Sequence, residues 1–76
     1  MTQHKIKLSL NEVKHFVAAA SRCDFDIDVS SYNRYVVDAK SIVGVLGLDL
    51  TSALTVSYDG YNADFEQYMQ SFAVAC

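Results

Sequence analysis

The amino-acid sequence predicts an α+β domain in which helices cover one face of an antiparallel sheet. Segments with apolar residues at every second position, typical of strands with one buried side, alternate with segments whose apolar spacing is three and four, typical of amphipathic helices. Their order is β-α-β-β-α-β-α, without repeats or linkers. The 76 residues are 51% hydrophobic and leave room for one core, so residues 1–76 should form a single domain.

The first two elements are a strand over residues 4–8 and a helix. Ile6 and Leu8 alternate with lysines, which indicates a strand with one solvated face. Ser9-Leu10-Asn11-Glu12 then has the form of a capping box, so a helix should begin there and end near Arg22. Its apolar stripe is Val13, Phe16, Val17 and Ala20.

A hairpin should follow. Residues 24–29 alternate between Phe25, Ile27 and Val29 on one side and three aspartates on the other. Residues 30–33 are typical of a turn. The returning strand should place Tyr35, Val37 and Ala39 toward the core.

The last three elements are a short helix, a strand and a longer helix. Ser41 is a candidate N-cap for a helix through Leu46, which Gly47 closes. Residues 54–58 alternate as the fourth strand, before a turn at Asp59-Gly60. Asn62 should cap the final helix. Its buried stripe is Phe65, Tyr68 or Met69, and Phe72.

Composition argues against several kinds of partner. The net charge is −3 and the six Lys and Arg are scattered, which disfavours nucleic acid and anionic membranes. The longest apolar run, residues 42–48, is too short for a membrane span and no signal peptide is visible, so we expect a cytoplasmic protein. Cys23 and Cys76 should then remain thiols rather than a disulfide.

No pattern of ligands predicts a metal site or a cofactor. His4, His15 and the two cysteines are scattered, and the aspartates of residues 24–29 fan along a strand instead of surrounding an ion. Gly44-Val45-Leu46-Gly47 has the spacing of an RNA-clamping loop, but its apolar setting favours packing and a helix cap. A nucleophilic pair of Cys23 and His15 is conceivable, although a buried cysteine is the commoner case.

The segment around Ser41 leaves two interpretations open. Ser41 can be only an N-cap, with Ile42 and Val43 in the core. Alternatively, because a five-residue helix cannot bury every face, Ile42 and Val43 leave apolar surface exposed beside the serine.

Ala39-Lys40-Ser41-Ile42-Val43-Gly44-Val45 resembles the Ala-Lys-Ser-Ile-x-Gly-Val run that carries the regulatory phosphoserine in Gram-positive members of the HPr family. HPr is the histidine-containing phosphocarrier of the bacterial sugar phosphotransferase system. The similarity extends to Phe16-Val17, the strand at residues 27–29 and residues 48–60. It implies an open-faced sandwich with strands in the order 1-4-2-3 and three helices on one face, and a carrier or regulator rather than an enzyme.

The family's phosphoacceptor motif is replaced in this chain. HPr proteins have Gly-x-His-x-Arg-Pro at the start of the first helix, and counting back from Phe16-Val17 puts Ser9 at the His, Asn11 at the Arg and Glu12 at the Pro position. In this respect the sequence is similar to Crh-like members, which lack the histidine and act as regulators. The resemblance implies Ser41 as phosphoacceptor and Ile42 with Val43 as the contact surface.

The partners that this resemblance implies are proteins of the phosphotransferase or catabolite-control system, namely a serine kinase and a transcription regulator. Two alternatives remain. The chain could be a working phosphocarrier that uses His4 or His15. It could also be a diverged structural or oligomerising domain, in which Ser41 is merely a helix cap.

Overall fold

The computed structural model describes residues 1–31 and 35–72. Part of the predicted turn at residues 30–33, and Cys76, lie outside the described residues. The elements are β1 (Thr2–Ile6), a 3-10 turn η1 (Leu10–Glu12), α1 (Val13–Ser21), β2 (Ile27–Ser30), β3 (Val36–Asp38), α2 (Ile42–Leu46), β4 (Leu54–Tyr58) and α3 (Ala63–Phe72).

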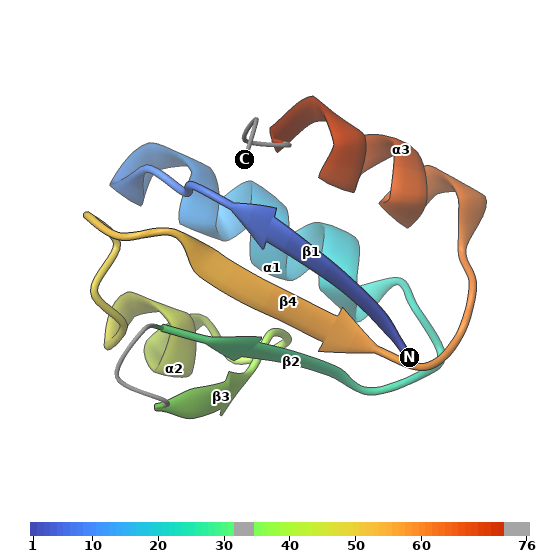
Figure 1. The fold of residues 1–76 in the computed structure, drawn as a ribbon, viewed down its shortest axis with the longest axis horizontal. Coiled ribbons are helices and arrows are strands. Elements are labelled where there is room, and N and C mark those ends of the chain that lie inside the picture. The colour runs from blue at the N-terminus through green and yellow to red at the C-terminus, as the bar shows by residue number, and fades with distance from the viewer. Residues whose placement is uncertain (32–34, 73–76) are drawn as a thin grey trace.

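The four strands form one antiparallel sheet in the order β1-β4-β2-β3, as predicted. β4 therefore lies between β1 and β2, and α1 and α2 lie behind the sheet, with α3 along the β1 side (Figure 1). The alternation in β4 buries Leu54, Val56 and Tyr58 against the helices. This face of the sheet and the apolar sides of α1 and α3 enclose the core.

β4 determines where its neighbours begin and end. β1 pairs with β4 from Thr2 opposite Tyr58 to Ile6 opposite Leu54. The strand is therefore shifted from the predicted 4–8, and Leu8 is buried beyond the paired segment. β2 begins at Ile27, opposite Tyr58, and not at the predicted residue 24, because β4 offers no further partner.

Tyr35 was predicted to face the core, and this prediction is wrong. Its side chain is 59% exposed, whereas Val37 is half-buried and Ala39 is fully buried as expected. β3 starts only at Val36, which pairs with Ser30, so Tyr35 lies before the paired segment at the edge of the sheet. Alternation predicts the side of a strand on which a residue lies, but not whether anything covers it there.

The helical stripes are largely as predicted. α1 buries Val13, Phe16 and Ala20, and α3 buries Phe65 and Met69. Met69, rather than Tyr68, supplies the middle of the stripe in α3, and Tyr68 is half-buried. The predicted cap of α3 is confirmed, since the Phe65 amide donates to Asn62 Oδ1 at 3.0 Å.

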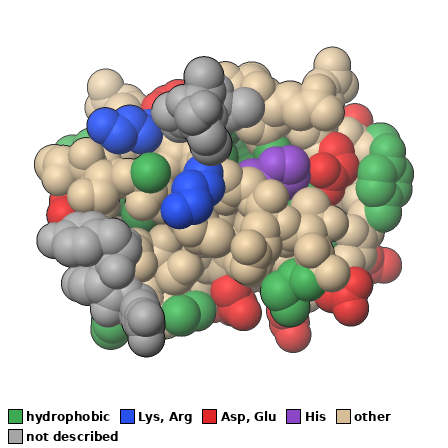
Figure 2. Space-filling model, in the orientation of Figure 1, with side chains coloured by type: hydrophobic (Ala, Val, Ile, Leu, Met, Phe, Trp, Pro, Cys, Tyr) green, Lys and Arg blue, Asp and Glu red, His purple; other side chains and the backbone are tan. Residues whose placement is uncertain are grey.

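The outer face of the sheet is polar. Figure 2 shows this side of the molecule, where acidic side chains gather along the lower and right margins and basic ones lie in the upper left part. None of the helices among the described residues is long and apolar enough for a membrane span.

Candidate functional site

The start of the first helix is closed by a capping box. The Glu12 carboxylate accepts hydrogen bonds from the Ser9 amide at 3.0 Å and the Ser9 hydroxyl at 2.8 Å. The backbone hydrogen bond, followed by the hydroxyl, lowers the pKa of Glu12, so the carboxylate is charged at neutral pH. Ser9 and Asn11 are exposed at this end, and a 3-10 turn precedes the α-helix. The start of the first helix thus presents the Ser9 hydroxyl, the Asn11 side-chain amide and the Glu12 carboxylate.

Removing this cap should cost stability. Ser9→Ala is expected to lower the free energy of unfolding by about 0.5–2 kcal/mol, because Glu12 loses the hydroxyl partner and the helix end loses its cap. Urea denaturation followed by circular dichroism measures the change. Ser21→Ala, which removes an exposed hydroxyl from the other end of α1, is the matched control. Equal losses in the two variants would contradict the assignment of Ser9 as a stabilising cap.

The predicted N-cap of α2 is confirmed. Ser41 is exposed and extended, and its Oγ accepts from the Gly44 amide at 3.1 Å. A Cβ atom at Gly44 would lie 3.2 Å from Val37 Cβ and 3.3 Å from Ser41 Oγ, so glycine lets α2 pack closely on β3. Gly47 is the C-cap, as predicted. The serine hydroxyl is therefore held at a defined place on the surface.

α2 leaves apolar side chains exposed, so Ile42 and Val43 do not lie in the core. Ile42 is 42%, Val43 78% and Leu46 47% exposed, while Val45 is fully buried. We call the three exposed residues the α2 apolar surface. Leu46 was not singled out from the sequence, although its i+4 spacing from Ile42 places the two on one helix face and could have revealed it.

A lysine joins the segment before Ser41 to the end of α1. Lys40 Nζ donates to the carbonyl oxygen of Cys23 at 3.0 Å, and the Lys40 amide donates to Asp38 Oδ1 at 2.9 Å. The Ser41 amide in turn donates to the Asp38 carbonyl oxygen at 3.0 Å. These contacts fix the chain on the N-terminal side of Ser41. Sequence reasoning missed the role of Lys40, because its partner is distant in the chain.

The structure places the two histidines apart from residues 9–12. His4 lies on the helix side of β1, where its Nε2 is 3.0 Å from the Tyr58 hydroxyl and 3.2 Å from Glu66 Oε1. The Tyr58 hydroxyl also donates to Glu66 Oε2. His15 is an exposed residue in the first turn of α1. Among the described residues, no hydrogen bond joins either histidine to the capping box.

The contact of Tyr58 with Glu66 should make the fold sensitive to alkali. Burial, and then the hydrogen bond and charge of Glu66, raise the pKa of the Tyr58 hydroxyl above its ordinary value. The folded state therefore keeps this proton while the unfolded chain loses it above about pH 10. The contribution of Tyr58 to stability should be constant below that pH and should fall above it, by up to about 1.4 kcal/mol per pH unit.

Urea denaturation between neutral and strongly alkaline pH checks this expectation. Tyr58→Phe should flatten the alkaline decline, and Tyr61→Phe, which alters an exposed tyrosine, should not. Burial also raises the pKa of the Cys23 thiol, so this cysteine is kept in every variant and its effect cancels in the comparison. Identical declines in the wild type and Tyr58→Phe would disprove the assignment.

Nucleophilic catalysis and metal binding find little support among the described residues. Cys23 is buried, 4% exposed, and its raised pKa disfavours the thiolate that a nucleophile requires. Within residues 1–31 and 35–72, no three His, Cys, Asp or Glu side chains gather as metal ligands. The candidate functional site is accordingly Ser41 with the α2 apolar surface.

Comparisons with known proteins agree on one family. A family model described as the PTS HPr component phosphorylation site matches residues 3–74. Two similar solved structures are phosphocarrier protein HPr from Bacillus anthracis str. Ames (TM-score 0.71, 23% identity, 96% of each chain covered) and HPr-C-His from Thermoanaerobacter tengcongensis (TM-score 0.70, 23% identity, 93% of each chain covered). No curated protein sequence matches the chain. The two structures show the same fold as this chain.

Proposed function

Because this chain belongs to the PTS HPr family, we propose that it is a regulatory member, phosphorylated on Ser41 instead of on a histidine. It acts in the cytoplasm through contacts with proteins of the phosphotransferase or catabolite-control system. The observation that carries the proposal is the juxtaposition of the exposed Ser41 hydroxyl with the α2 apolar surface. A serine kinase and a transcription regulator are the partners that it needs.

The composition of the α1 start supports a regulatory role over a carrier role. Phosphoryl transfer through histidine requires an imidazole as nucleophile and benefits from a cation that steadies the phosphate. Ser9 and Asn11 supply neither group, and the charged Glu12 carboxylate repels an incoming phosphoryl group. His4 is a poor substitute, because its Nε2 contacts Glu66 and Tyr58.

Phosphate on Ser41 changes the surface more than the fold. The side chain is exposed, so the modification displaces no packed group. Its oxygens remain within reach of the Gly44 amide, which already donates to Ser41 Oγ. A group of about −1.5 to −2 charge then lies beside Ile42 and Val43. A partner with Arg or Lys next to an apolar pocket gains charge-assisted hydrogen bonds, whereas an acidic rim is repelled.

Two labelling reactions test the proposal. The protein is incubated either with enzyme I and phosphoenolpyruvate or with an HPr serine kinase and ATP, and phosphate is mapped by mass spectrometry. We expect label on Ser41 from the kinase and no acid-labile label from enzyme I. Ser41→Ala should abolish the kinase label, and Ser9→Ala should retain it.

The other outcomes discriminate among the alternatives. Acid-labile phosphate on His4 or His15 would indicate a working phosphocarrier, and His→Ala substitution would identify the acceptor. Absence of label in both reactions would leave a structural domain in which Ser41 is a helix cap.

A further inference from the structure

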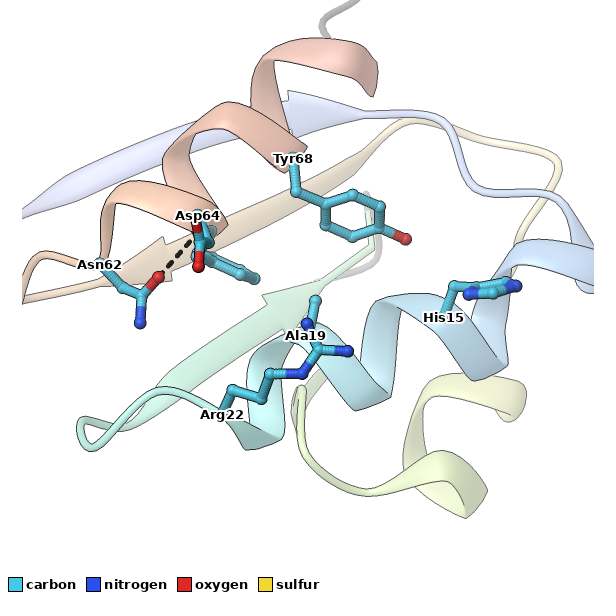
Figure 3. Close-up of a pocket in the computed structure, with 7 residues that line it drawn as sticks. His15, Ala19, Arg22, Asn62, Asp64 and Tyr68 are labelled. Carbon is cyan, nitrogen blue, oxygen red and sulfur yellow. Dashed lines mark hydrogen bonds between the residues drawn. The ribbon is translucent and has the colours of Figure 1, made fainter.

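A cavity of about 220 Å³ opens between α1 and α3, away from the α2 apolar surface. Figure 3 shows its lining residues, which come from the two helices and from the cap of α3. They are His15, Ala19, Arg22, Asn62, Asp64, Phe65 and Tyr68. The volume is suited to a small molecule rather than to a protein segment.

The α1 wall results from residue spacing. His15, Ala19 and Arg22 are spaced i, i+4 and i+7, so they lie on one face of α1. Ala19 has the shortest of these side chains, and Figure 3 shows the Arg22 side chain extending toward it. Among the described residues, no hydrogen bond or ion pair engages the Arg22 guanidinium. This wall therefore offers the Arg22 guanidinium, for which residues 1–31 and 35–72 supply no partner.

The α3 wall contributes polar groups that can still donate hydrogen bonds. Asn62 Oδ1 caps the helix by accepting from the Phe65 amide, so the two amide protons of Asn62 are left as donors. The Tyr68 hydroxyl points toward α1 (Figure 3) and is buried without a hydrogen-bond partner among the described residues. Burial raises the pKa of Tyr68, so the hydroxyl stays protonated and can donate. An unpaired buried hydroxyl carries a penalty that an entering polar group relieves.

Opposite charges face the cavity from its two walls. Arg22 extends from the end of α1 and Asp64 from the first turn of α3. No ion pair joins them, although both side chains line the same space. A ligand with one negative and one positive charge would pair with both Arg22 and Asp64. A simple anion would be repelled by Asp64, and a simple cation by Arg22. Ala19 supplies apolar surface between these groups, whereas Phe65 lies almost wholly in the core.

We propose that this cavity binds a free α-amino acid with an apolar side chain. Its carboxylate lies against Arg22 and the Tyr68 hydroxyl, its ammonium group faces Asp64, and its side chain covers Ala19. The proposal concerns a face of the molecule other than Ser41 and does not depend on the proposed function.

Nuclear magnetic resonance titration of the isotope-labelled protein tests the proposal. The probes are L-leucine and L-phenylalanine at millimolar concentrations, each compared with its N-acetyl derivative, which lacks the cation, and its amide, which lacks the anion. We expect saturable shifts at backbone amides of residues 15–22 and 62–68 for the free amino acids. Both derivatives should bind roughly tenfold more weakly.

Charge variants provide the controls. Arg22→Gln and Asp64→Asn should each weaken binding roughly tenfold, while Lys14→Gln and Asp59→Asn make the same charge changes outside the cavity and should have no effect. Tyr68→Phe should weaken binding without lowering stability, since it removes a hydroxyl that has no partner in the described part of the chain. Absence of saturable shifts with both amino acids, shifts elsewhere in the molecule, or equal binding of the derivatives would overturn the proposal.

Discussion

Tyr58→Ala is expected to lower the free energy of unfolding by about 3–5 kcal/mol, because it removes a large aromatic side chain from the centre of the fold. Tyr58 is 2% exposed in the central strand β4. Its ring stacks on Phe25 at a centroid distance of 5.5 Å and contacts Phe65 edge-on at 5.3 Å. The substitution also removes the hydroxyl that contacts Glu66 and His4, which keep their contact with each other at 3.2 Å.

The loss should be large relative to the whole domain. Single domains have a stability of roughly 0.05–0.15 kcal/mol per residue, and this chain has 76 residues. A loss of about 3–5 kcal/mol therefore removes a large part of a total stability of about 4–11 kcal/mol. Urea denaturation followed by circular dichroism measures the loss, with Tyr61→Ala as the control, because Tyr61 is 75% exposed. Tyr58→Phe, which removes only the hydroxyl, should cost about 1–3 kcal/mol. Similar losses in Tyr58→Ala and Tyr61→Ala would show that the aromatic cluster does not stabilise the fold.

Val43→Asp should reduce phosphorylation of Ser41 by an HPr serine kinase about 10- to 100-fold in kcat/KM. Val43 is 78% exposed and adjoins Ile42, so the carboxylate places a desolvation cost and a negative charge in the proposed contact surface. The fold should be retained, with a stability change within about 0.5 kcal/mol, because the side chain is not in the core.

Phosphate incorporation over time at several substrate concentrations measures this effect. Tyr61→Asp is the matched control, since it introduces the same charge at another exposed apolar residue. Equal kcat/KM values for wild type and Val43→Asp would show that the kinase does not contact the α2 apolar surface. A melting temperature measured on each variant separates loss of contact from loss of fold.

Local patterns were sufficient to predict most of the elements. Two examples are the alternation at residues 54–58 and the helix cap and stop around residues 41–47. Each pattern acts within one element, so the sequence alone is sufficient to predict that element. Strand ends depend on partners instead. β2 starts at Ile27 only because β4 ends at Tyr58. Tyr35 is exposed because the pairing of β3 with β2 begins only after it, at Val36.

The candidate site also combines local features, which the sequence predicts, with long-range contacts, which it does not. Ser41 and the exposure of Ile42 and Val43 were open to sequence reasoning, because a cap and a five-residue helix are local features. The contacts of His4 with Tyr58 and Glu66 were not, since 54 and 62 residues separate these partners along the chain. The cavity between α1 and α3 likewise arises from helices that meet only in the folded state.

The central position of β4 has a consequence for biosynthesis. β1 and β2 are not paired with each other; each forms its ladder with β4, which the ribosome makes last among the four strands. Before residues 54–58 emerge, the pairing available is that of the short β2–β3 hairpin, which is marginal in isolation. Until then the nascent chain carries the apolar sides of β1 and α1 without the strand that completes their core. The sheet therefore assembles after translation of β4, and a ribosome stalled before Leu54 would hold an unfolded, aggregation-prone chain.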